Sequence, residues 1–178
     1  MEFNYNQDFI GVIAPKGSGK TYLVKEILKS IPNKVILDTN DEYDDYKESV
    51  ITPDEFSSNY FDAFLETLIK EKRNYTIIVD DIDVYTPLKS KLLPVFNANS
   101  RHKGLGVIYV SRRPKRLDPV MVQNTDYFFL GYPLLPQDKK YIESLLNFEI
   151  KDSFYNNLKQ YQFILLDVRN RTQEIVYV

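Results

Sequence analysis

The chain has 178 residues, a net charge of −2, and 43% hydrophobic and 27% charged residues, which fits a single domain over residues 1–178 with a substantial core. It has no cysteine and only one histidine, His102, which excludes disulfides, cysteine nucleophiles, and metal sites rich in cysteine or histidine. No apolar run approaches ~18 residues and the first residues are too polar for a signal peptide, so we expect a cytoplasmic protein without stable membrane insertion.

The first expected elements enclose a glycine-rich turn. Residues 9–13 form an apolar run of strand type, and apolar residues recur at helical spacing from Leu23 to Ile31. Between them, residues 14–21 read Ala-Pro-Lys-Gly-Ser-Gly-Lys-Thr, which is the phosphate-loop (Walker A) pattern with Ala14 in place of its usual first glycine. A strand, a turn and a helix in this order are the context in which the pattern binds nucleotide phosphates.

The residue types of this turn suit ATP and Mg²⁺. Glycine lets backbone N–H groups curl around a polyphosphate. We expect Lys20 to reach the β- and γ-phosphates and the hydroxyl of Thr21 to hold Mg²⁺. The residues expected to contact the nucleotide are Pro15, Lys16, Gly17, Ser18, Gly19, Lys20, Thr21 and Tyr22. The alternative interpretation is a chance glycine-rich turn that caps a helix.

Strand-like and helix-like segments alternate through the rest of the chain. The expected strands are residues 34–37, 76–79, 106–110, 127–130, 163–166 and 174–178. One helix is expected to start at Thr52, with Thr52 as N-cap and Pro53 in the first turn, and another covers residues 137–146. The last two strands are separated by a polar segment and predict a C-terminal β-hairpin. This order predicts an α/β fold with a mostly parallel sheet and helices on both faces.

Two carboxylates follow the apolar run at residues 77–79. An acidic pair at the end of a buried strand, about 60 residues after a phosphate loop, is the Walker B arrangement. We expect Asp80 to contact the magnesium shell and Asp81 to polarise the attacking water. Asp83 is interpreted as structural.

Charge is unevenly distributed along the chain. Residues 84–117 contain eight basic and no acidic side chains, which is typical of a patch that binds phosphate groups. Residues 38–48 contain six acids and one lysine, and we interpret this acidic loop as solvated surface rather than as part of a site.

The basic segment carries a family resemblance. Residues 100–104 read Ser-Arg-His-Lys-Gly before one strand, and residues 111–114 read Ser-Arg-Arg-Pro at its end. Together with the phosphate loop and the Walker B acids, this order over residues 9 to about 130 resembles the HerA/FtsK superfamily of DNA-pumping ATPases. The chain's size is similar to that of viral genome-packaging ATPases, and the chain also resembles the zonular-occludens-toxin-like phage assembly ATPases.

The resemblance implies a RecA-like ATPase that assembles into a hexameric or pentameric ring. It also implies that the ring moves double-stranded DNA without sequence preference, with a viral capsid as the expected destination. Arg101 matches a family arginine that enters the neighbouring subunit's site, and Arg113 matches the arginine of the family's Arg-Pro pair. Ser111 matches a threonine, and Arg112 stands where a glutamine sensor of the γ-phosphate is usual. Either Ser111 or Arg112 then senses the γ-phosphate, or the γ-phosphate is sensed only weakly. A capsid vertex is a further implied partner, with the host cytoplasm or the virion as location.

DNA contacts are expected from basic residues near the Walker B strand and after the Arg-Pro pair. These residues are Lys89, Lys91, Lys115 and Arg116. Two other classes of function stay open from the sequence. An AAA-type loader that uses ATP as a switch has a similar Walker B segment, and a small phosphotransferase also uses a phosphate loop.

Overall fold

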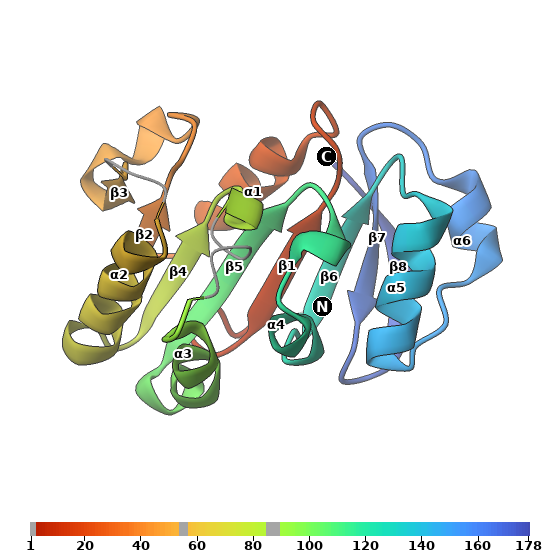
Figure 1. Cartoon of the computed structure of the whole chain (residues 1–178). Coiled ribbons are helices and arrows are strands. Elements are labelled where there is room, and N and C mark those ends of the chain that lie inside the picture. Colours follow the sequence, from red (N-terminus) through yellow and green to blue (C-terminus); the bar gives the residue numbers. More distant parts are fainter. Residues whose placement is uncertain (1–2, 54–56, 85–89) are drawn as a thin grey trace.

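The computed structural model describes residues 3–53, 57–84 and 90–178, and within them eight strands form one sheet in the order β3-β2-β4-β5-β1-β6-β7-β8 (Figure 1). The strands are β1 (Phe9–Ile13), β2 (Lys34–Leu37), β3 (Val50–Ile51), β4 (Tyr75–Val79), β5 (Leu105–Ser111), β6 (Tyr127–Gly131), β7 (Gln162–Asp167) and β8 (Thr172–Tyr177). The α-helices are α1 (Lys20–Leu28), α2 (Ser58–Glu71), α3 (Leu93–Asn99), α4 (Pro119–Gln123), α5 (Pro136–Leu146) and α6 (Asp152–Asn157). Short 3-10 helices are η1 (Asp44–Ser49), η2 (Ile82–Val84), η4 (Arg101–Lys103) and η5 (Pro114–Arg116).

The strands from β3 to β6 in the sheet order are parallel, whereas β7 is antiparallel to β6 and β8 is antiparallel to β7. The carboxyl ends of the parallel strands therefore lie at one edge of the sheet, which we call the carboxyl edge. The opposite edge, where these strands begin, is the amino edge. The start of β7 and the end of β8 also lie at the carboxyl edge, because Gln162 pairs with Tyr177 and Phe163 pairs with Gly131.

Two apolar layers cover the two faces of the sheet. On one face, the apolar side chains of α1, such as Val24 and Leu28, cluster with Val12 and Ile108. On the other face, apolar side chains from α2 to α5 cluster with alternate residues of the same strands, including Phe9. Figure 1 shows α2, α3, α4 and α5 in front of the sheet. The predicted α/β class, with helices on both faces and a C-terminal hairpin, is confirmed.

The first helix predicted after β2 begins later than expected. It starts at Ser58, and Ser57 rather than Thr52 is the N-cap, because the side chain of Ser57 accepts a hydrogen bond from the Tyr60 N–H at 3.1 Å. Residues 54–56 of the expected helix start lie outside the described residues. Thr52 lies directly after the short strand β3 and not at a helix start. The pairing of β3 with β2 was not predicted from the sequence.

No helix in the described part of the chain has both the length and the apolar character required to cross a bilayer.

Close packing at the amino edge gives a test of the fold. A β-carbon placed on Gly106 of β5 would lie 1.8 Å from the carbonyl oxygen of Tyr5, which accepts a hydrogen bond from the Thr76 hydroxyl at 2.9 Å. Gly106→Ala must push the N-terminal segment away from β5, so we expect a loss of about 1–3 kcal/mol in the free energy of unfolding. Chemical denaturation measures this loss, and an unchanged midpoint would show that the segment does not pack here.

Candidate nucleotide-binding site

The turn after β1 has the backbone conformation of a phosphate loop. Gly17 and Gly19 have φ values of 77° and 92°, in the left-handed region that favours glycine. Gly19 is the N-cap of α1, so the first N–H groups of the helix point into the turn. The Ala14 N–H donates to the carbonyl oxygen of Ser111 at 3.1 Å, which ties the loop to the end of β5. Ala14 therefore leaves the loop intact.

Lys20 is held inside the loop. Its ammonium group donates to the carbonyl oxygen of Pro15 at 3.0 Å, and the hydroxyl of Ser18 donates to the same oxygen at 2.7 Å. Burial lowers the pKa of Lys20, and the negative charges of Asp81 and Asp80 act in the opposite direction. The cation is thus desolvated and lies close to where the loop's N–H groups converge.

A cavity of about 330 Å³ opens above the loop at the carboxyl edge. Its lining residues are Lys16, Gly17, Gly19, Lys20, Thr21, Tyr22, Asn40, Glu42, Asp80, Asp81 and Arg112. Nine of these eleven were predicted from the sequence as nucleotide or catalytic residues, and Asn40 and Glu42 were not. Pro15 and Ser18, also predicted as nucleotide contacts, are not among the lining residues, and their hydrogen bonds support the loop.

The two Walker B acids lie at the end of β4 and share a donor. The side-chain N–H₂ of Asn40 donates to Asp81 at 2.9 Å and to Asp80 at 3.4 Å. Burial raises the pKa of Asp80 to about 7, and the nearby charges of Asp81 and Glu42 add to this shift. Asp81 has a φ of 43°, which turns the chain sharply after the strand.

Arg112 reaches the same acids from the end of β5. Its guanidinium group lies 2.6 Å from the Asp81 carboxylate, and this hydrogen bond raises the pKa of Arg112. Its backbone N–H donates to Asp83 at 3.1 Å, so the acid interpreted as structural holds the turn that presents Arg112. About half of the Arg112 side chain, 49%, is exposed, which leaves its guanidinium accessible to a ligand in the cavity.

Ser111, the other candidate sensor, is buried, and its hydroxyl donates to the carbonyl oxygen of Arg113 at 3.0 Å. It does not line the cavity. The Arg113 guanidinium pairs with Asp138 of α5 at 2.7 Å and fastens the turn to that helix. Of the two sensor candidates, only the side chain of Arg112 lines the cavity.

The acidic loop after β2 was interpreted from the sequence as solvated surface, and this is wrong for part of it. Glu42 lines the cavity and accepts a hydrogen bond from the hydroxyl of Thr21. Asp38 is buried and accepts the backbone N–H groups of Asn40 and Tyr43, both at 3.0 Å, which fixes the loop's path toward the site. The loop reaches the site because β2 neighbours β4 in the sheet.

The oxygen atoms around Thr21 fit a magnesium ion bound together with a nucleotide. Mg²⁺ in proteins takes one or two side-chain oxygens and completes its shell with phosphates and water. Thr21, Asp80 and Glu42 offer a hydroxyl and two carboxylates at this end of the cavity. Among the described residues, no group of three or more His, Cys, Asp or Glu side chains is arranged to hold a metal ion.

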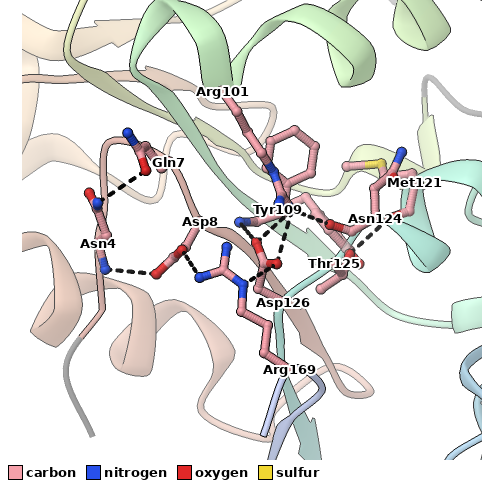
Figure 2. Close-up of polar contacts among 11 residues, drawn as sticks. Asn4, Gln7, Asp8, Arg101, Tyr109, Met121, Asn124, Thr125, Asp126 and Arg169 are labelled. Carbon is pink, nitrogen blue, oxygen red and sulfur yellow. Dashed lines mark hydrogen bonds and ion pairs between the residues drawn. The ribbon is translucent and has the colours of Figure 1, made fainter.

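Arg101 lies at the amino edge, far from the phosphate loop of its own chain. Its guanidinium donates to Asp126 at 2.8 Å and to the carbonyl oxygen of Asn124 at 2.8 Å (Figure 2). The guanidinium also lies over the ring of Phe9, 5.4 Å from its centroid. The acidic partner of Arg101 thus comes from outside the acid-free segment of residues 84–117. The seven residues of β5 span about 20 Å, so Arg101 cannot reach its own nucleotide.

Asp126 has a second cationic partner in the same cluster. Arg169, from the turn between β7 and β8, donates to Asp126 at 2.8 Å and pairs with the buried Asp8 at 2.9 Å, as Figure 2 shows. The backbone N–H of Phe9 also donates to Asp126 at 2.8 Å. Sequence alone did not single out Asp126 or Arg169.

The expected DNA contacts are spread over the surface. Lys115 and Arg116 are exposed on η5, which follows the carboxyl end of β5. Lys91 is exposed, and its backbone N–H donates to Asp62 of α2 at 3.2 Å. Lys89 lies outside the described residues.

Comparison with known proteins agrees with this geometry. A family model described as the viral superfamily 1 RNA helicase core domain matches residues 14–93, from the phosphate loop past the Walker B acids. No curated protein sequence matches the chain.

Among solved structures, the chain is similar to the genome packaging NTPase B204 from Sulfolobus turreted icosahedral virus 2 in complex with ATP-gammaS. The TM-score is 0.79 and the sequence identity is 22%, and the match covers 97% of this chain and 98% of that one. The fold is that of a P-loop NTPase. ATPases 2 and 3 of EssC from Geobacillus thermodenitrificans match with a TM-score of 0.70 and 14% identity over 94% of this chain and 39% of that one. The N-terminal domain of zonular occludens toxin from Neisseria meningitidis matches with a TM-score of 0.54 and 15% identity over 97% and 94%. The resemblance predicted from the sequence is thus confirmed at the level of the fold.

The burial of Asp80 gives a pH-dependent prediction. A carboxyl whose pKa is about 7 in the folded protein and near 4 in the unfolded chain makes the fold less stable as pH rises from 4 to 7. Without ligand, we expect Asp80→Asn to be more stable than the parent by roughly 2–4 kcal/mol at pH 8 and nearly equal to it near pH 4. Urea denaturation at the two pH values measures this difference. A difference that does not change with pH would contradict the raised pKa.

Proposed function

We propose that this protein is an ATP-hydrolysing motor that moves double-stranded DNA, with packaging of a viral genome into a capsid as its biological task. The observation that supports this most is the convergence of Lys20, Asp80, Asp81 and Arg112 on one cavity at the phosphate loop. ATP hydrolysis could serve several tasks, and the near full-length structural similarity to a genome packaging NTPase favours DNA packaging among them.

In this proposal, the phosphate loop and Lys20 bind the β- and γ-phosphates of ATP. Thr21 and Asp80 would hold Mg²⁺, which when bound offsets the charge of the phosphates. Asp81 orients the attacking water. Arg112 pairs with Asp81 before ATP arrives, and the γ-phosphate is a second anionic partner for the same guanidinium. Transfer of Arg112 to the γ-phosphate would free Asp81 for the water, so that the acid becomes available only when ATP is in place.

Hydrolysis also requires a positive charge from a neighbouring subunit in this proposal. Arg101 cannot act on the nucleotide of its own chain, but its side chain is 40% exposed at the amino edge. In a ring where the amino edge of one subunit faces the carboxyl edge of the next, Arg101 would lie near the nucleotide of that next subunit. To act there, Arg101 has to exchange Asp126 for a phosphate. The ring would be a pentamer or hexamer, located in the host cytoplasm or at a capsid vertex.

Duplex DNA is the proposed substrate of the motor, contacted through its phosphates. Lys115 and Arg116 are exposed close to Arg112 in sequence, so their movement would be coupled to the state of the nucleotide site. Contacts to phosphates carry no sequence information, which suits a protein that must move along any genome.

DNA binding is tested by its dependence on salt. With an ATP analogue and Mg²⁺, we expect duplex DNA of any sequence to bind, with an affinity that falls steeply as salt rises. Lys115→Ala/Arg116→Ala should reduce the slope of log affinity against log salt by up to about 2, because each lost phosphate contact removes about 0.9. Fluorescence anisotropy at several salt concentrations measures the slope.

The matched control is Lys72→Ala/Arg73→Ala, which removes an equal charge from the turn before β4 at the amino edge. If the slope falls equally in both variants, net charge alone determines the salt dependence, and the assignment of the DNA contacts to η5 is wrong. ATP hydrolysis without any DNA binding would instead favour a phosphotransferase.

Catalysis across subunits is tested by mixing two inactive variants. Lys20→Ala should lose Mg-ATP binding, whereas Arg101→Ala should bind ATP and hydrolyse it at least ~10³-fold more slowly, as for the loss of an arginine finger. Mixed rings contain interfaces with an intact loop and an intact arginine, so mixing should restore part of the activity. Steady-state ATPase assays at several mixing ratios measure the recovery. No recovery, with mixed oligomers shown to form, would remove Arg101 from the neighbouring site.

A further inference from the structure

A tyrosine next to the phosphate loop is not used by any step described above. A β-carbon placed on Gly19 would lie 3.3 Å from Cδ1 of Tyr161 and 3.5 Å from Cγ2 of Val178. Tyr161 directly precedes β7, and Val178 directly follows β8. In Figure 1 the carboxyl end lies beside the loop that follows β1. These two side chains therefore close the flank of the phosphate loop that faces β7 and β8.

This flank is where a nucleoside bound to the loop would lie. The groups proposed to meet the γ-phosphate, Asp80 and Arg112, come from β4 and β5, on one side of β1 in the sheet. If the γ-phosphate lies beside Asp80 and Arg112, the β- and α-phosphates lie along the loop in the direction of β6. The sugar and base then lie on the side of β1 opposite to β4 and β5. That side is occupied by β6, β7 and β8.

The backbone of Tyr161 is in a conformation that a bulky residue avoids. Its φ is 61°, in the left-handed region, which costs an L-residue with a β-carbon about 1–2 kcal/mol. The turn is fixed by two backbone hydrogen bonds of 3.1 Å, from the Gln162 N–H to Lys159 and from the Val178 N–H to Tyr161. Burial of the side chain does not offset this cost, because Tyr161 is 51% exposed. A glycine or asparagine would suit the turn better, so the ring itself points to a function.

We propose that Tyr161 is the platform on which the base of a nucleoside triphosphate stacks. The proposal rests on the proposed function, since it requires the phosphates to bind at the loop. An aromatic ring holds a base through its π-face, which every base has. The site is therefore tolerant of the base: ATP, GTP and CTP bind with affinities within about tenfold of one another, and the phosphate loop supplies the part of the binding that they share.

The experiment compares a ligand that has a base with one that lacks it. Calorimetry measures the affinities of Mg-ATP and of inorganic tripolyphosphate with Mg²⁺. Tyr161→Ala should weaken Mg-ATP by about 5- to 100-fold, the range for loss of one base–aromatic stack, and leave tripolyphosphate unchanged. Tyr161→Phe should retain the affinity of the parent for both ligands.

A second variant separates stacking from folding. Tyr161→Asn suits the left-handed backbone, so it should raise the midpoint of thermal unfolding while losing the same affinity for Mg-ATP. The matched control is Tyr177→Ala. Tyr177 is 76% exposed on β8, and it stands between Val176 and Val178, which pack on the α1 face, so strand alternation directs it to the opposite face. This control should bind both ligands as the parent does.

The outcomes distinguish this inference from the proposed function. Lys20→Ala should weaken both ligands, and if the parent binds neither ligand, the nucleotide site itself is wrong. If Lys20→Ala loses ATP while Tyr161→Ala and Tyr161→Asn keep it, the site stands and the platform does not exist. The platform is also refuted if Tyr22→Ala, which removes the exposed tyrosine of α1, accounts for the whole difference between ATP and tripolyphosphate.

Discussion

The position of β5 between β1 and β4 is the constraint on which the site depends. Ile13 pairs with Ser111 and Val79 pairs with Tyr109, so the three strands end within a few residues of one another at the same edge. The phosphate loop, Arg112 and the Walker B acids are the next residues along each chain segment. All seven residues of β5 are buried, and a strand buried on both faces in a parallel sheet has little freedom to shift its register. The relative positions of the residues that line the cavity are thus set by core packing and not by the loops themselves.

The electrostatic state of the cavity follows from that geometry. Three cations, Lys16, Lys20 and Arg112, and three carboxylates, Asp80, Asp81 and Glu42, line the cavity. Two of these cations already have a partner within the protein, since Lys20 donates to Pro15 and Arg112 to Asp81. A bound triphosphate would replace these internal partners, and the crowded carboxylates would gain the cation that accompanies the nucleotide. The affinity of the site for a triphosphate would therefore be a difference between two largely paired states, which limits how tight the binding can be.

Local signals in the sequence predicted the parts of this fold that depend on neighbouring residues. The strands, the phosphate loop and the Walker B acids are each encoded within a few positions, so Lys20, Thr21, Asp80 and Arg112 could be assigned before the structure. Glu42 and Asn40 could not, because they reach the site only through the adjacency of β2 and β4, which the sequence does not display. The helix start was misplaced because Thr52 and Ser57 are both residue types that cap helices, and the local sequence does not choose between them.

Contacts between side chains that are far apart in the chain could not be predicted from the sequence either. Nothing in the residues around Arg101 indicates that Asp126, from the start of another strand, lies beside it, or that Arg169 shares that acid. The hydrogen-bond and cation–π partners of Arg101 come from two segments distant in sequence, Phe9 and residues 124–126, so the residues around Arg101 could not indicate them.

The sharing of Asp126 has a mechanical consequence. A buried carboxylate that loses its only cation is left unpaired at a large energetic penalty. Asp126 would instead keep Arg169 and the Phe9 N–H if Arg101 swung outward. Release of the Arg101 side chain from this cluster should therefore cost less than breaking an isolated buried ion pair, because Asp126 keeps two of its partners. If Arg101 acts on a neighbouring molecule as proposed, its side chain can leave and return repeatedly without leaving the buried Asp126 unpaired.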